Sequence, residues 1–241
     1  METLRAQFKN RLNPLYDELF SDLNVEKETA FVMQWGDKFP TEINTGILFV
    51  GKAVNGWFGK KYQSFEKLLN ITNKMQWVKD QWNRKKTKDS KKQPYITKRS
   101  AFWKVIKGIT LEYYKDPNQW HSYVAWSNLF KKSPNDRGNP QKIDEKLKDL
   151  CKRILKAEIE ILSPKYVIFL TSGWEEKYKF LKYLNDNQSP KMIDEQKWKG
   201  KNKEYKVGLY NINDTIYITS VHPQGKKEAP HIKTIVEFLS K

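Results

Sequence analysis

The sequence predicts a single α/β domain, a three-layer α/β/α sandwich around a central, mostly parallel sheet. Short, continuous apolar runs at 47–50 and 166–170 are typical of strands that are buried on both faces of a parallel sheet. Longer stretches with apolar residues at helical spacing separate these runs, and strands that alternate with helices form βαβ units. The length of 241 residues is enough for one domain of this kind to bury its core.

The N-terminal half begins with helical spacing and ends in a basic stretch. Residues 4–23 predict one helix, or a broken pair, because Pro14 interrupts the apolar pattern. We therefore interpret residues 1–45 as a helical extension that packs on the domain. The apolar residues of 64–82 suggest further helices, and the lysine-rich residues 84–93 predict a basic loop.

Helices and strands alternate through the rest of the chain, with turn-forming residues at their boundaries. The expected order is a helix at 101–114, a strand at 121–126, a loop at 133–140, a helix at 144–162, a strand at 166–170, a helix at 174–184, a lysine-rich insertion at 185–204, a hairpin of strands at 205–210 and 215–219, and a helix at 229–239.

The composition indicates a polyanion as the partner. Lys and Arg number 45 against 28 Asp and Glu, which gives a formal net charge of +17, and such an excess is typical of proteins that bind nucleic acid. The 14% of aromatic residues, nine Trp among them, could also stack on unpaired bases. A biased genome that coats the surface with lysine is the alternative explanation.

Other features argue against metals, disulfides and membranes. One cysteine, Cys151, cannot form an internal disulfide or hold a metal cluster, and the three histidines, His121, His222 and His231, lack partners at recognised ligand spacing. Met1 is followed by charges without an apolar run, and no stretch has the length of a membrane helix. We expect a monomeric cytoplasmic protein without cofactor or metal.

Functional residues should follow the strands, since ligands of open parallel sheets lie beyond the carboxyl ends of the strands. Four segments qualify, namely 51–57, 127–131, 171–173 and 220–225. Gly51 and Gly56 have the spacing of a phosphate-binding loop, but Trp57 occupies the place of its lysine. A nucleoside triphosphatase is therefore disfavoured, and an ordinary strand-to-helix turn is the alternative interpretation of the glycines.

Three of these regions, in this order, resemble the motif set of the uracil-DNA glycosylase superfamily. Residues 48–56 resemble its first motif, residues 128–140 its second, with an Asn followed by basic residues and prolines, and residues 218–223 its His-Pro motif. The resemblance is closest to branches with a Gly-x-x-Pro-Gly first motif and covers residues 46–240. The iron–sulfur cysteines of one branch are absent.

The resemblance implies a uracil-DNA glycosylase-like fold and an enzyme that flips a base out of DNA and hydrolyses its N-glycosidic bond. The base would be uracil or a modified pyrimidine such as those of phage DNA, in repair or in defence against phage. His222 would donate a hydrogen bond to the departing base, and Asn128 would bind its Watson–Crick edge. A half-buried structural histidine and a turn-forming asparagine are the alternatives.

The first motif departs from the family pattern. Val54 and Asn55 replace the usual Pro-Gly, and Lys52 stands where some members have an acid. We expect Asn55 to hold the attacking water. Lys52 could instead attack the sugar as an amine nucleophile, although a phosphate contact or a role of its backbone alone is the simpler expectation.

The remaining site residues would contact the base or the DNA backbone. Phe58 or Phe65 would stack on the base, with Trp57 as the next candidate, and core packing is the alternative for Phe65. Base recognition would also involve Gly51, Lys52 and Ala53. The expected DNA contacts are Ser172, Gln224, Gly225, Lys226, Lys227, Lys131 and Arg137.

Two other functions remain open from the sequence. A non-catalytic nucleic-acid-binding protein of the same fold would bind DNA with strong salt dependence and release no base. A glycosidase or deaminase of free nucleosides would have no need of the net charge of +17.

Overall fold

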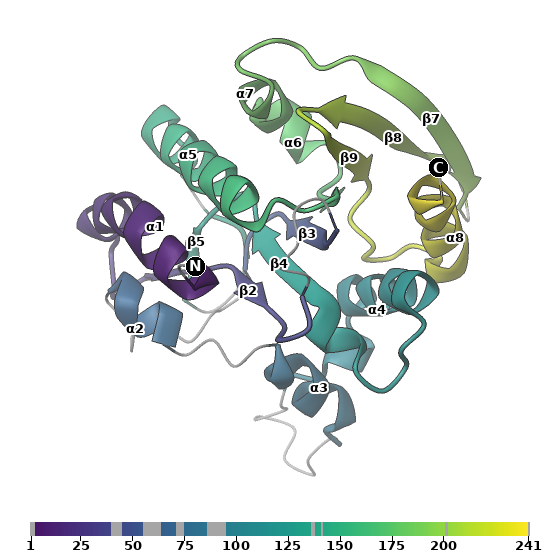
Figure 1. The fold of residues 1–241 in the computed structure, drawn as a ribbon, viewed down its shortest axis with the longest axis horizontal. Coiled ribbons are helices and arrows are strands. Elements are labelled where there is room, and N and C mark those ends of the chain that lie inside the picture. Colours follow the sequence, from purple (N-terminus) through teal and green to yellow (C-terminus); the bar gives the residue numbers. More distant parts are fainter. Residues whose placement is uncertain are drawn as a thin grey trace.

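A computed structural model describes residues 3–39, 45–54, 64–70, 75–85, 95–135, 138–140, 142–200 and 202–240. Within these residues, a seven-stranded sheet runs through the molecule (Figure 1). Its strands, in spatial order, are β2 (Gln34–Trp35), β4 (Val124–Asn128), β3 (Ile47–Gly51), β6 (Tyr166–Leu170), β9 (Thr215–Ser220), β8 (Glu204–Ile212) and β7 (Met192–Lys199). The four central strands β4, β3, β6 and β9 are parallel, while β2, β8 and β7 are antiparallel to their neighbours.

Helices cover both faces of the sheet. They are α1 (Leu4–Ser21), α2 (Phe65–Asn70), α3 (Gln76–Asn83), α4 (Ala101–Tyr114), α5 (Glu145–Leu162), α6 (Trp174–Lys177), α7 (Phe180–Leu184) and α8 (Glu228–Leu239), with 3₁₀ turns at Thr97–Arg99 and Trp120–Tyr123. Helices α1 and α5 pack together on one face, and α4 and α8 on the other (Figure 1). The expected mixed α/β class, with parallel central strands between helices, is confirmed, and the arrangement is compatible with a three-layer sandwich.

Several expected elements have different boundaries. Pro14 does not break α1, because Phe8, Leu12 and Tyr16 bury one stripe of the helix in the core. The strand expected at 121–126 begins with a 3₁₀ turn and continues to Asn128. The expected loop at 133–140 begins in β5 (Lys132–Pro134), which pairs with β1 (Glu28–Ala30).

Two predictions for residues 174–204 are wrong. The single helix expected at 174–184 is divided into α6 and α7, because Lys179 between them adopts a left-handed φ of 59°. The insertion at 185–204, expected as a basic loop, contains strand β7, which pairs with β8 along its length. Only Trp198 of this strand is buried, so backbone pairing rather than an apolar pattern holds it. The basic loop at 84–93 lies largely outside the described residues.

A buried ion pair joins the end of β4 to α5. The side chains of Lys131 and Glu158 are both fully buried, with 2.6 Å between Nζ and Oε2. The Lys131 ammonium also donates to the Asn128 carbonyl at 2.8 Å and to Ser127 Oγ at 2.5 Å. Burial raises the pKa of Glu158, and Lys131 and Ser127 act against that rise. The prediction that Lys131 contacts DNA is therefore wrong, since its charge is already neutralised inside the protein.

The single cysteine, Cys151, belongs to the buried core. Cys151 is free and buried next to this ion pair, where Lys131 N donates to its Sγ at 3.4 Å. Burial raises the pKa of its thiol to about 11.

None of the helices in the described part of the chain is long and apolar enough to cross a membrane.

Removing one partner of the buried ion pair should strongly destabilise the fold. We expect Lys131→Met to lower the free energy of unfolding by about 3–5 kcal/mol, because Glu158 would be left as a buried charge without a partner. Urea denaturation measures the change. The double variant Lys131→Met/Glu158→Leu should recover most of the loss. Lys9→Gln, which removes an exposed ion pair with Glu66, is the control and should change stability little. A Lys131→Met protein as stable as this control would contradict the prediction.

Candidate functional site

A cavity of about 970 Å³ lies at the carboxyl ends of β3 and β4. Ligands of parallel sheets bind at this edge, and the cavity contains much of the site expected from the sequence. The expected residues that line it are Gly51, Lys52, Ala53, Asn128, His222, Gln224 and Gly225. The structure thus brings together residues that are up to about 170 positions apart in the chain.

Asn128 presents a buried amide to this cavity. It is the last residue of β4, pairs in register with Gly51 of β3 and is 1% exposed. Its Nδ2 is buried without a hydrogen-bond partner in the described structure. Since a buried donor without an acceptor costs about 1–3 kcal/mol, this amide is set up to donate to a ligand in the cavity.

Gly51 makes room for this amide. A Cβ atom at residue 51 would lie 2.5 Å from Asn128 Oδ1 and 3.4 Å from Phe102 Cε2. The first distance is shorter than any van der Waals contact. Any side chain at residue 51 would therefore displace the Asn128 amide.

His222 is a neutral hydrogen-bond donor in the same cavity. Its pKa is lowered to about 4, first by burial and then by the charges of Lys52 and Lys226. Its Nδ1 accepts a hydrogen bond from Gln224 N at 3.3 Å, so the proton of the neutral ring is on Nε2. The ring stacks on Phe102, with centroids 5.9 Å apart and an interplanar angle of 16°.

Ser172 fixes the loop that carries His222. Its Oγ accepts from the backbone N of His222 at 2.8 Å, and its own backbone N, like that of Thr171, donates to the Ser220 carbonyl at 3.1–3.2 Å. Ser172 adopts a left-handed φ of 58° to do so. The loops after β6 and β9 are therefore joined, and Ser172, expected to contact DNA, already uses its hydroxyl within the protein.

The start of α4 contributes residues that the sequence analysis missed. Tyr95, Arg99, Ser100 and Phe102 line the cavity, although residues 101–114 were expected only as a helix, with no part in the site. The first amides of a helix lack intrahelical acceptors and favour anions. The pair Arg99-Ser100 directly before the helix was the available signal in the sequence.

Other expected site residues lie elsewhere. The prediction that Phe65 stacks on a base is wrong, because Phe65 is buried and stacks on Tyr16 with centroids 4.6 Å apart. Lys227 is exposed at the start of α8. Asn55, Trp57, Phe58 and Arg137 lie outside the described residues.

The described residues contain no candidate metal site, and the chain matches neither a protein-family model nor a curated protein. Among residues 3–240, apart from the gaps given above, no group of three or more His, Cys, Asp or Glu side chains could hold a metal ion. The resemblance to uracil-DNA glycosylases remains a prediction.

The depressed pKa of His222 predicts a loss of stability in acid. Unfolded histidine titrates near 6.5 and folded His222 near 4, so between these values only the unfolded chain gains the proton. Acidification from pH 7 to pH 4 should therefore lower the free energy of unfolding, and His222→Asn should reduce this dependence. NMR titration should show a neutral ring protonated on Nε2 above pH 5. A midpoint at pH 6 or higher would contradict the expectation.

Gly51→Ala should damage the site more than the fold. The new Cβ would push the Asn128 amide from its position, at a cost of roughly 1–3 kcal/mol in stability. We expect ligand binding in the cavity to weaken at least as much as it does in Asn128→Ala. Asn211→Ala, at an exposed position of β8 that does not line the cavity, is the control and should retain wild-type binding. Unchanged binding by Gly51→Ala would show that Gly51 does not position Asn128.

Proposed function

We propose that this protein is a DNA glycosylase that takes an extruded base into the cavity and hydrolyses its N-glycosidic bond. The observation that carries the proposal is the buried Asn128 amide, whose Nδ2 lacks a partner in the described structure, in one cavity with the neutral His222. An amide and an imidazole N–H at a strand edge are suited to bind the polar edge of a base.

His222 would stabilise the departing base. Breaking the glycosidic bond leaves negative charge on the base, and a positioned donor lowers the barrier most where that charge develops. The Nε2–H of His222 is such a donor, and its loop is held by Ser172 and Gln224. The charges of Lys52 and Lys226, which depress the pKa of His222, would also stabilise an anionic base.

Asn128 and Phe102 would bind the base before cleavage. The Asn128 amide donates through Nδ2 to a carbonyl of the base, a group that uracil and its derivatives carry. Phe102 lines the cavity and supplies the aromatic face that we expected from Phe65 or Phe58.

The size of the cavity is compatible with a substituted base. Its volume of about 970 Å³ is at the upper end of the roughly 300–1,000 Å³ that is usual for small-ligand sites. A pyrimidine with a bulky substituent would fit there, as would uracil together with its sugar and phosphate. Uracil and modified pyrimidines, such as those of phage DNA, are therefore the substrates to test.

One observation favours a non-catalytic function as the second candidate. No Asp or Glu among the described residues lines the cavity, so none of them is placed to activate water. If Asn55 does not hold the water, the protein would bind an extruded base without releasing it. Such a protein would still show salt-dependent DNA binding.

A single-turnover assay of base release tests the proposal. Duplex and single-stranded oligonucleotides would contain uracil, hypoxanthine, hydroxymethylcytosine or glucosylated cytosine. We expect release of one base, a loss of about 10²–10³-fold in rate with His222→Ala, and strongly reduced binding and release with Asn128→Ala.

Asn211→Ala, at an exposed position of β8, is the control and should retain the wild-type rate. Tight, salt-sensitive DNA binding without release of a base from any substrate would refute the glycosylase and support the non-catalytic function. Release that is unaffected by His222→Ala would exclude the proposed role of His222.

A further inference from the structure

The turn end of the β7–β8 hairpin packs against helix α8. Trp198 of β7 lies against Tyr205 of β8 in a tilted arrangement, with centroids 4.6 Å apart, and stacks on His231 of α8 with centroids 5.1 Å apart. Gly200 N closes the turn by donating to the Lys203 carbonyl at 2.8 Å. The insertion that the sequence suggested to be a loop is therefore fixed to the helix that follows the His222 loop.

The ammonium groups of two lysines lie near the ring of Tyr205. Lys203 comes from the hairpin and Lys226 from the loop after His222, and their Nζ atoms lie 5.3 and 5.5 Å from the ring centroid. Lys226 Nζ also donates to the Gln224 carbonyl at 3.0 Å. In the described residues, neither ammonium forms an ion pair with a carboxylate.

The third lysine of this group is Lys52, which lines the cavity. Lys52 Nζ lies 4.7 Å from the centroid of Trp174. Burial and then Lys226 lower the pKa of Lys52, and Lys203 contributes to the lowered pKa of Lys226, so the three charges repel one another. Glu175 acts in the opposite direction on Lys52, but burial raises its own pKa to about 7.

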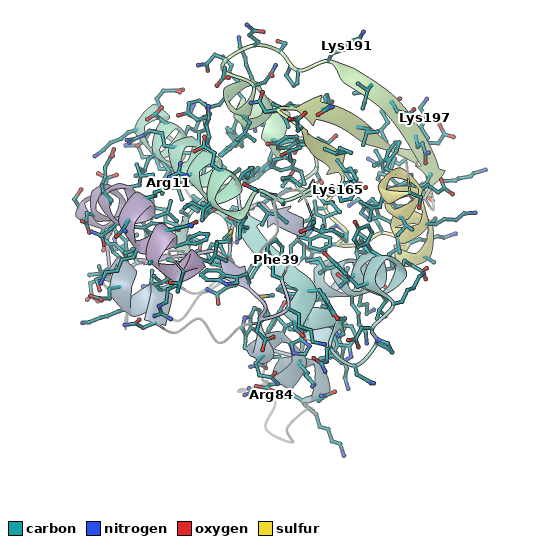
Figure 2. The ribbon with its side chains drawn as sticks, viewed as in Figure 1. Arg11, Phe39, Arg84, Lys165, Lys191 and Lys197 are labelled. Carbon is teal, nitrogen blue, oxygen red and sulfur yellow. The ribbon has the colours of Figure 1, made fainter. Side chains whose placement is uncertain are left out.

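This group differs from lysines on other surfaces of the molecule. Lys9 and Lys104, for example, form ion pairs with Glu66 and Glu228. Like charges held together on aromatic rings, with no carboxylate ion-paired to them among the described residues, are unfavourable in the free protein and favourable when an anion binds. Two further lysines lie on the same hairpin, Lys197 on the outer edge strand β7 and Lys191 directly before it (Figure 2).

We propose that Lys52, Lys226 and Lys203 form a lysine track that binds the phosphodiester backbone of the DNA strand whose base enters the cavity. The inference rests on the proposed function and deepens it, because it assigns the β7–β8 hairpin to the DNA-binding surface. The track leads from the cavity wall across the Gln224 loop to the hairpin, so it would contact successive phosphates of one strand. Aromatic rings beneath the ammonium groups hold them in place without neutralising them.

The salt dependence of DNA binding tests the track. The affinity of the full chain for a uracil-containing duplex would be measured by fluorescence anisotropy over a series of salt concentrations. Each phosphate contact contributes about 0.9 to the slope of log K against log salt. Lys203→Gln/Lys226→Gln should therefore reduce the slope by about 1.8, whereas Lys203→Arg/Lys226→Arg should retain it.

Lys9→Gln on α1 is the matched control, since α1 lies on the opposite side of the sheet from α8 (Figure 1), and it should keep the wild-type slope. A double Gln variant with the wild-type slope would overturn the track even if base release were intact. A reduced slope without release of any base would support the track and refute the glycosylase. A wild-type protein that fails to bind DNA would refute both.

Discussion

The parallel pairing of β3 with β4 continues beyond the two strands, and the arrangement of the cavity depends on it. Leu129 N donates to the Gly51 carbonyl at 2.8 Å and Phe130 N to the Lys52 carbonyl at 2.9 Å. Asn128 is the register partner of Gly51, and its side-chain Oδ1 occupies the space that a Cβ at residue 51 would need. The buried Lys131 ammonium donates to the backbone carbonyl of Asn128, so the backbone from which the side-chain amide projects is fixed.

The sequence was informative where burial and local pattern agree. Residues 47–50 and 166–170 are apolar throughout because helices cover both faces of their strands, and the cavity lies after such strands. The pattern failed where distant residues decide the outcome. From the sequence alone, Lys131 is indistinguishable from a surface lysine, because its partner Glu158 is 27 residues away in the chain. The polar strand β7 forms because its backbone pairs with β8. The start of α4 joins the cavity only through tertiary packing.

Net charge and local charge have separate roles in this molecule. The excess of +17 describes the whole surface, where several lysines are neutralised by carboxylates. Near the cavity, Lys52 and Lys226 remain as cations, and both depress the pKa of His222. The charges that would attract a nucleic acid thus act together with burial, the larger cause, to keep the histidine neutral and able to donate from Nε2.

The hydrogen bonds of Ser172 hold the side of the cavity that carries His222. The loops after β6 and β9 are tied to each other through Ser172 Oγ and the Ser220 carbonyl, so His222 cannot shift without disturbing both. On the other side of the cavity, the described start of the segment after β3 is bonded to its neighbour through the Gly51 and Lys52 carbonyls. Substitutions at Ala53 and Val54, which line the cavity there, can change the shape of the cavity while the bonds that position His222 stay in place. The shape of the cavity and the geometry of its hydrogen-bond donors can therefore evolve separately on this scaffold.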